Sequence, residues 1–313
     1  MKIIEKQQVF ENLSFDSLIA ALRKSFAGSF TMPQRQVFEL QPGDPSHNAF
    51  AVLPAWDEEV IGVKSFTYFP NNAESGYESL YSKIMLFSRA HGEPLALVDG
   101  TSVTLWRTAA VSALAADYLV RKDAKHLVFY GTGNLASHMI KAHLSVRTYQ
   151  KVTIIGRNDD KVASLIASLE TDFEDTEFVK GESDQQTIAS ACTISCATGS
   201  PEPLFDGQWI SSGTHIDLIG NHHKHCRECD THTVTQSKVF VDSRTNVLNE
   251  AGELLIPIAE GAFAKENVQA ELAELCSGSV SGRENTEQIT LFKSVGTALS
   301  DLVGANLVYK LAK

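Results

Sequence analysis

The sequence of 313 residues predicts an α/β fold, in which a parallel sheet covered by helices on both faces is joined to a part of mixed α+β character. Three observations support this prediction. Apolar strand-like runs alternate with helical patterns from residue 126 to residue 241, as in a chain of βαβ units. A glycine-rich turn follows the first of these runs. Several short strand-like runs, with no helical pattern between them, fill residues 36–99.

The glycine-rich turn lies within residues 126–136, where an apolar run enters Gly131-x-Gly133-x-x-Ala136 and a helical pattern follows at once. Gly131 permits a tight turn, Gly133 lets the backbone approach a pyrophosphate, and Ala136 lets the helix pack close to the strand. The helix N-terminus then faces the negative charge of the ligand. A glycine turn between any strand and helix shows the same pattern, but this context predicts a Rossmann-type dinucleotide-binding domain.

The second strand of this domain, residues 151–155, indicates which nucleotide is bound. A site for NAD usually places an acid after this strand, to bind the ribose hydroxyls. Here Arg157 and Asn158 follow instead. The Arg157 guanidinium can stack on adenine and pair with a 2′-phosphate, and Asn158 can hydrogen-bond the same phosphate. We therefore predict NADP(H) as the preferred cofactor, with NAD(H) possible. Asp159 and Asp160 either reach the ribose or cap the next helix.

The remaining elements follow from hydrophobic periodicity. A helix is expected over 13–27, followed by strands near 36–40, 48–54, 59–69, 82–88 and 95–99, and by an alanine-rich helix over 102–121. Strands and helices then alternate over 126–130, 134–147, 151–155, 160–169, 177–179, 184–190, 192–196, 214–219 and 238–241, and a last helix is expected over 292–311. This order predicts a discontinuous first domain, residues 1–121 with 290–313, and a second domain, residues 122–289.

Composition excludes several classes of partner. The formal net charge of −11, from 27 basic and 38 acidic side chains, argues against a nucleic-acid or anionic-membrane surface. The chain lacks an apolar run of the roughly 18 residues that span a membrane, and its first residues lack the apolar segment of a secretion signal, so a cytoplasmic location is expected. The five cysteines are odd in number, which is not a disulfide framework.

Three cations of the first domain lie in apolar or turn-like surroundings: Arg35, Lys64 and Arg107. Taken singly, each residue type is most often a surface charge. A buried cation, however, needs a partner, which is either an internal acid or a bound carboxylate.

The sequence resembles the ornithine cyclodeaminase and mu-crystallin family along nearly its whole length. The matching stretches are Met32-Pro33-Gln34-Arg35, Gly62-Val63-Lys64-Ser65 with Pro70-Asn71-Asn72, Leu97-Val98-Asp99-Gly100, Arg107-Thr108-Ala109-Ala110, Gly131-Thr132-Gly133 and Ile289-Thr290-Leu291-Phe292-Lys293-Ser294-Val295-Gly296. Together they are far more specific than the glycine turn.

The resemblance implies an NAD(P)-dependent enzyme with a Rossmann-type domain and an α+β domain for substrate binding and dimerisation. It implies that Arg35, Lys64 and Arg107 bind a substrate carboxylate, and that Ser294 lies near substrate and nicotinamide. The expected cofactor-binding residues are Ser79, Arg107, Thr108, Gly131, Thr132, Gly133, Asn134, Leu135, Arg157, Asn158, Ala197, Thr198, Ile219 and Gly220.

One departure from the family pattern concerns the reaction. Cyclodeaminases of this family carry an aspartate where this chain has Asn221, and asparagine cannot act as a general base. Asp217 lies four residues back and would not replace it. Branches without the aspartate resemble reductases of cyclic imino acids.

We therefore expect an NAD(P)H-dependent reductase of Δ1-pyrroline-2-carboxylate, with Δ1-piperideine-2-carboxylate as the second candidate substrate and with Lys64, Arg107, Asn221 and Ser294 as the catalytic set. Hydride transfer from the cofactor to a held imine needs little acid–base equipment. Lys64 is the expected proton donor, with His222 as a second candidate. Three alternatives stay open: ornithine cyclodeaminase, an alanine-type dehydrogenase, and a non-catalytic NADPH-binding protein of crystallin type.

The run from His222 to His232, with Cys226-x-x-Cys229 at its centre, offers enough ligands for a tetrahedral zinc site. No second cysteine pair stands at zinc-ribbon spacing, so we favour a polar active-site loop and expect no metal.

Overall fold

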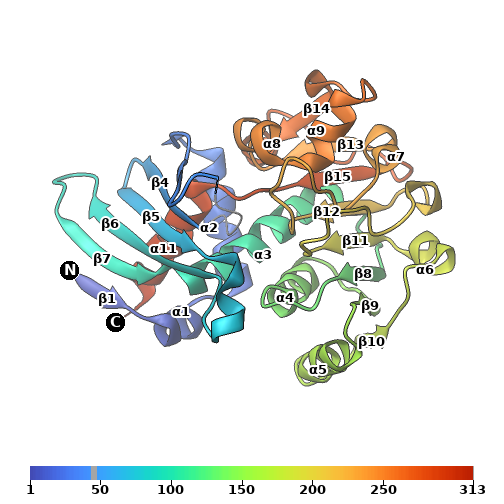
Figure 1. The fold of residues 1–313 in the computed structure, drawn as a ribbon, viewed down its shortest axis with the longest axis horizontal. Coiled ribbons are helices and arrows are strands. Elements are labelled where there is room, and N and C mark those ends of the chain that lie inside the picture. The colour runs from blue at the N-terminus through green and yellow to red at the C-terminus, as the bar shows by residue number, and fades with distance from the viewer. Residues whose placement is uncertain (44–47, 313) are drawn as a thin grey trace. The chain divides into compact units, whose positions relative to one another are not determined.

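The computed structural model describes residues 1–43 and 48–312, and it divides into two compact units (Figure 1). The first unit comprises Met1–Thr108 with Thr297–Lys313, and the second comprises Ala109–Gly296. The predicted division lay at 121/122 and 289/290. The chain instead leaves the first unit inside a long helix and returns to it after a strand that belongs to the second unit.

The first unit is built on a seven-stranded sheet with the order β1-β7-β6-β5-β4-β2, to which β3 adds by pairing with β4. Its strands are β1 (Lys2–Ile4), β2 (Phe30–Thr31), β3 (Gln36–Glu39), β4 (Ala49–Asp57), β5 (Val60–Tyr68), β6 (Leu80–Ser88) and β7 (Pro94–Asp99). Its helices are α1 (Lys6–Asn12), α2 (Phe15–Ala27), the start of α3 (Gly100–Leu119), α11 (Ala298–Leu311) and the 3₁₀ helix η1 (Pro70–Ser75). Strand β1 is parallel to β7, and the other pairs are antiparallel.

Strands β4, β5 and β6 alternate between buried and partly exposed side chains, as the period of two requires for a sheet with one covered face. Helix α11 covers that face, and α2 packs on α11. The covering is close, because a Cβ on Gly62 would lie 2.4 Å from Leu302 Cδ1 of α11. Small residues in the sheet therefore bring α11 within reach of the side chains that β5 directs to this face.

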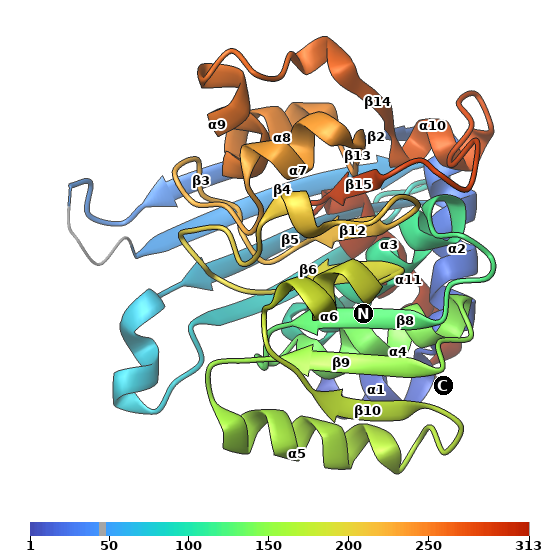
Figure 2. The same cartoon turned by 90° about the vertical axis from the view of Figure 1, so that its right-hand side faces the viewer.

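The second unit is built on an eight-stranded parallel sheet with the order β10-β9-β8-β11-β12-β15-β13-β14 (Figure 2). Its strands are β8 (His126–Tyr130), β9 (Lys151–Ile155), β10 (Glu177–Lys180), β11 (Thr193–Cys196), β12 (His215–Leu218), β13 (Lys238–Val241), β14 (Val268–Glu271) and β15 (Thr290–Lys293). Its helices, besides the rest of α3, are α4 (Ala136–Val146), α5 (Asp159–Glu170), α6 (Gln185–Ser190), α7 (Thr231–Gln236), α8 (Arg244–Glu250), α9 (Gly252–Ala259) and α10 (Leu272–Ser277), with the 3₁₀ helices η2 (Gly207–Trp209) and η3 (Lys265–Asn267).

The strand order of the second unit reverses between β8 and β11, which is the switch point of a doubly wound sheet. Ligands of such sheets bind at the carboxyl ends of the strands beside this point. The predicted α/β class, with a Rossmann-type parallel sheet and a second α+β unit, is confirmed.

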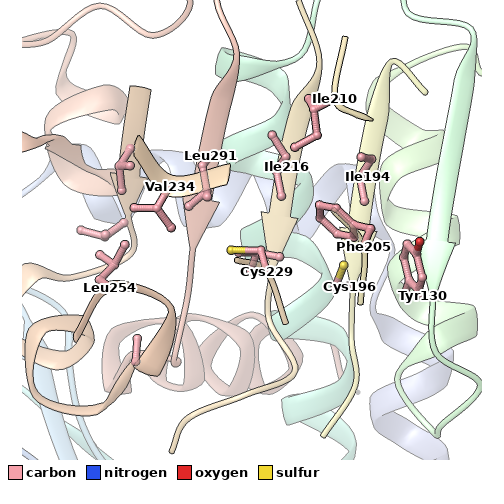
Figure 3. Close-up of a cluster of buried hydrophobic side chains, with 14 of the residues drawn as sticks. Tyr130, Ile194, Cys196, Phe205, Ile210, Ile216, Cys229, Val234, Leu254 and Leu291 are labelled. Carbon is pink, nitrogen blue, oxygen red and sulfur yellow. The ribbon is translucent and has the colours of Figure 1, made fainter. Parts of the chain in front are cut away.

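Both faces of this sheet are buried, by different means. One face packs an apolar cluster that includes Ile194, Ile216 and Leu291 from the strands and Leu254 from α9 (Figure 3). On the other face, Asp217 of β12 is fully buried and accepts hydrogen bonds from Ser112 of α3 at 2.9 Å and His143 of α4 at 3.0 Å. A third hydrogen bond comes from Ser195 of β11 at 2.8 Å. These bonds fix α3 and α4 on the sheet, because a buried carboxylate is costly unless it is paired.

The prediction of a last helix over 292–311 was wrong at its start. Thr290–Lys293 is β15, a central strand whose four side chains are all buried, and Gly296, at a φ of 86°, separates it from α11. A short buried strand and a buried helical turn have the same apolar composition, so periodicity does not distinguish them. Strands β1, β2 and β14 and helices α1, α7, α8, α9 and α10 were also not predicted. Among the described residues, no helix has the length and apolar character needed to cross a membrane.

Candidate active site

The glycine turn lies at the carboxyl end of β8, beside the switch point. Gly131 has a φ of 124°, and a Cβ there would lie 2.7 Å from the carbonyl oxygen of Ala197, so a side chain is excluded twice over. At Gly133 a Cβ would meet no described atom within 4 Å, which leaves its backbone open to a ligand. Asn134 and Leu135 follow, and within the described chain no side chain caps the start of α4. The positive end of the helix dipole at this N-terminus suits a pyrophosphate.

The residues expected to select the cofactor follow β9, the neighbouring strand. Arg157 is exposed, so its guanidinium is open to a ligand. Asn158 caps α5, because its Oδ1 accepts from Lys161 N at 2.9 Å. Asp159 pairs with Lys180 at 2.8 Å. The cap is thus an asparagine and neither of the two aspartates, and the carboxylate of Asp159 is partly neutralised.

Four other expected cofactor residues form two turns at the carboxyl ends of β11 and β12. Ala197 N donates to Tyr130 O at 2.9 Å, and Ile219 N donates to Cys196 O at 3.0 Å, so each turn is tied to the preceding strand of the sheet. Gly220 lies against Thr198, where a Cβ would be 2.1 Å from the backbone nitrogen. The two turns therefore touch, and any larger residue at Gly220 would separate them.

Asn221 and Ser294 also lie at this edge of the sheet, both 2% exposed. The Asn221 side-chain amide donates to Ser200 O at 2.6 Å, which fixes its orientation and offers no base. The Ser294 hydroxyl donates to Asp242 Oδ2 at 2.7 Å. The hydroxyl proton of Ser294 is therefore already used, and Gly296 N donates to its oxygen at 3.2 Å, so one lone pair of this oxygen remains for a ligand. Asp242, at the end of β13, was not predicted.

In the first unit, Lys64 of β5 and Arg107 of α3 meet on one carboxylate. Asp301 Oδ1 of α11 lies 3.1 Å from Lys64 Nζ and 2.9 Å from Arg107 Nε. All three side chains are nearly inaccessible, and Lys64 also donates to Thr104 Oγ1 at 2.6 Å. Two cations thus share one acid, which leaves a positive charge for a bound carboxylate to balance.

The ammonium of Lys64 is placed to supply a proton. Burial lowers the pKa of Lys64 to about 8, a fall that Asp301 limits and that Arg107 and Arg35 deepen. Because this pKa lies near neutral pH, Lys64 can hold a proton and also give it up. Asp301 was not predicted, although an acid among Leu299, Leu302 and Val303 of an apolar helix is a recognisable sign of a buried ion pair.

The other expected residues of the first unit are more scattered. Arg35 is partly buried before β3, and its charge lowers the pKa of Lys64. Thr108 is 9% exposed and follows Arg107 in α3. Ser79 lies in the turn before β6, where its carbonyl accepts from Phe69 N at 2.8 Å. No hydrogen bond or ion pair of the described residues links Ser79 to the Lys64 cluster.

The expected loop after β12 shows no arrangement suited to zinc. Cys229 is buried in the apolar cluster beside β12, and burial raises the pKa of its thiol (Figure 3). Within residues 1–43 and 48–312, no three side chains of metal-binding type gather. His222 and His223 stack on each other, with ring centroids 4.6 Å apart, in an exposed segment.

The chain is similar to known proteins along its full length. The family model described as the ornithine cyclodeaminase/mu-crystallin family matches residues 2–313. A Δ1-pyrroline-2-carboxylate reductase of Colwellia psychrerythraea is 56% identical over 315 residues, covering 100% of both chains.

Solved structures agree with that match. The Thermococcus litoralis Δ1-pyrroline-2-carboxylate reductase, in complex with NADH and L-proline, superposes with a TM-score of 0.93 at 33% identity, covering 100% of this chain and 97% of the other. An archaeal alanine dehydrogenase dimer with bound NAD superposes with a TM-score of 0.92 at 25% identity, covering 100% and 96%.

Proposed function

The chain belongs to the ornithine cyclodeaminase/mu-crystallin family, and from that premise we propose that it reduces Δ1-pyrroline-2-carboxylate to L-proline with a nicotinamide cofactor. It is an oxidoreductase that acts on C=N bonds. The six-membered Δ1-piperideine-2-carboxylate is the second substrate that the same chemistry accepts.

The observation that carries this proposal is the cluster of Lys64 and Arg107 on Asp301. A cyclic imine with a 2-carboxylate needs a cation for its anion and a proton for its ring nitrogen. Arg107 meets the first need, because within the described part of the chain no hydrogen bond occupies its terminal nitrogens. Lys64 meets the second, because its pKa is held at about 8.

The reaction requires the protein residues only to orient the substrate and to supply one proton. When bound, a reduced nicotinamide supplies the hydride that converts the imine carbon to C–H. Arg107 orients the substrate carboxylate, and the positive charge of Arg35 assists it. Lys64 gives its proton to the ring nitrogen. Asn221 holds its amide on Ser200 O and activates no water, which disfavours the deamination of ornithine or alanine.

A panel of substrates tests the reaction. Oxidation of NADH and NADPH should be fast with Δ1-pyrroline-2-carboxylate, and absent with pyruvate plus ammonia; ornithine with NAD should give no turnover. Lys64→Ala and Arg107→Ala should each lower kcat/KM for the imine by about a hundredfold, as for the loss of a charge-assisted bond. Lys310→Ala, which removes an exposed lysine of the same unit, is the control. Turnover of ornithine with an inert imine would overturn the proposal.

We propose NADPH as the preferred cofactor, with NADH also accepted. The support is the exposed Arg157 after β9, next to the capping Asn158. Arg157→Ala should raise the KM for NADPH about tenfold while leaving that for NADH within about twofold, since one lost phosphate contact is worth about 1.4 kcal/mol. Lys161→Ala, on the next turn of the chain, should change neither value. Equal effects of Arg157→Ala on both cofactors would contradict the preference.

We also propose that two copies pair through the first unit, as a homodimer. The support is a row of apolar side chains, from Pro54 to Ile3, across the face of its sheet that is opposite α11. A cytoplasmic location stays a prediction.

A further inference from the structure

A carboxylate that none of the steps above uses lies at the carboxyl edge of the second sheet. Glu228, in the loop after β12, is 0% exposed. Its Oε1 accepts from Thr198 N at 2.7 Å and from Thr198 Oγ1 at 2.9 Å, and its Oε2 accepts from Gly220 N at 2.9 Å. The two oxygens thus clamp the turns that follow β11 and β12.

A second buried acid and a lysine support this clamp. Glu253 of α9 accepts from Glu228 N at 3.3 Å and pairs with Lys293 of β15 at 3.0 Å, both side chains being fully buried. Lys293 Nζ also donates to Asn221 O at 2.6 Å. The turns after β11 and β12 and the end of β15 therefore form one hydrogen-bonded unit.

The strand order assigns this unit to one half of a dinucleotide. Strands β8, β9 and β10 form one half of the doubly wound sheet, and β11, β12 and β15 form the other. The glycine turn and Arg157 belong to the first half, which takes the adenosine side. The turns that Glu228 holds belong to the second half, which takes the nicotinamide side.

We propose that Glu228 is a positioning residue for the nicotinamide half of the cofactor, because its two oxygens join the Thr198 and Gly220 turns at the carboxyl edge of that half of the sheet. The inference rests on the proposed use of a nicotinamide cofactor and is independent of which imine is reduced. Glu228 touches the turns and acts through them.

The clamp needs the ionised carboxylate, since each oxygen must accept from an N–H group. Burial raises the pKa of Glu228 to about 7, an increase to which Glu253 of α9 adds, whereas Lys293 of β15 and the bonds from Thr198 act against it. Protonation turns one acceptor into a donor, which opposes an N–H group. The hold on the turns should therefore weaken as the pH falls through about 7.

The test compares binding of NADH with binding of ADP, which carries the adenosine half without the nicotinamide riboside. Glu228→Gln places an NH₂ group opposite Gly220 N–H, so it should raise the dissociation constant for NADH about tenfold, or about 1.4 kcal/mol, and leave that for ADP unchanged. Asp230→Asn is the matched control. Asp230 lies two residues further in the same loop, where its side chain caps α7 and accepts a hydrogen bond from Gly207 N. Among the described residues it makes no hydrogen bond to the turns after β11 and β12. This control should change neither constant.

Two further measurements test the same inference if Glu228→Gln does not fold. Glu228→Asp, whose shorter side chain reaches one turn but not both, should weaken NADH binding relative to the unaltered protein, again with ADP unchanged. In the unaltered protein, NADH binding should weaken between pH 8 and pH 6 more than ADP binding.

The outcomes separate the two proposals. Parallel losses for NADH and ADP would show a general structural role for Glu228 and overturn this inference, as would unchanged NADH binding in both variants and across that pH range. Failure of the unaltered protein to bind NADH or NADPH would overturn the proposed function instead.

Discussion

At the scale of single residues, the reaction depends on how Asp301 balances Lys64. Burial alone would drive the pKa of Lys64 further down, and Arg107 adds to that effect, whereas the Asp301 carboxylate opposes it. The amine stays protonated below a pH of about 8 and loses its proton as the pH rises through that value. Imine reduction that takes its proton from Lys64 should decline over the same range.

Asp301→Asn should move this decline to lower pH. Loss of the carboxylate removes the favourable charge and leaves the burial, so the basic limb of the pH profile of kcat/KM should shift down by about one unit or more. Thr104→Val is the control, because it removes the other partner of Lys64 without changing charge. If the basic limb of the pH profile of kcat/KM stays at the same pH in Asp301→Asn, or shifts equally in both variants, this role of Asp301 is contradicted.

Residue types were more predictable from the sequence than their partners were. Lys64 and Arg107 stood out because cations in apolar surroundings need an explanation. Asp301, Asp242 and Glu228 did not, because their partners are distant in the chain. Lys64 and Asp301, for example, are 237 positions apart. The apolar neighbours of Asp301 are a local sign of a buried acid, but they do not identify its partner, because the fold brings the pair together.

At the scale of elements, the first sheet has one face on which no helix of its own unit packs within the described residues. The register puts a row of apolar side chains across it, from Pro54 of β4 through Val63, Met85 and Leu97 to Ile3 of β1. Ile3 is 60% exposed, and the others are partly exposed. A contiguous apolar patch of this kind is what the proposed dimer interface requires.

Met85→Glu should therefore convert a dimer into monomers. The new charge lies at the centre of the row, where pairing would bury it without a partner. Light scattering should give the mass of two chains for the unaltered protein and of one for the variant. Ala163→Glu adds the same charge to an exposed position of α5 and should leave the dimer intact. A monomeric unaltered protein, or a dimer that survives Met85→Glu, would contradict this interface.

Elements were predictable where one period dominated. The alternation in β4, β5 and β6 gave strands close to those observed, because one face is buried and the other is not. Strand β15 was read as a helix because all four of its residues are buried, so it has no alternation to show. Helices α8 and α9 lie between β13 and β14, and α10 lies between β14 and β15; all three are short and carry too few turns to impose a period.

At the scale of the whole molecule, the order of the chain explains which parts of the site the sequence could group. The glycine turn, Arg157 and the turns after β11 and β12 belong to one continuous stretch, so a known sheet topology assigns them together. The first unit is closed by both ends of the chain, where Lys2 Nζ donates to Ala312 O at 2.7 Å and α11 supplies Asp301. The sequence predicted that both ends of the chain belong to the first unit, but its spacing could not identify these contacts.

The most direct test of imine reduction follows the hydride itself. The enzyme should be given NADPH or NADH carrying deuterium at the transferable position of nicotinamide C4, together with Δ1-pyrroline-2-carboxylate, and the product examined by mass spectrometry and NMR. The account predicts L-proline with one deuterium at Cα, formed in step with cofactor oxidation. Cofactor oxidation without proline, or proline with no deuterium at Cα, would contradict it.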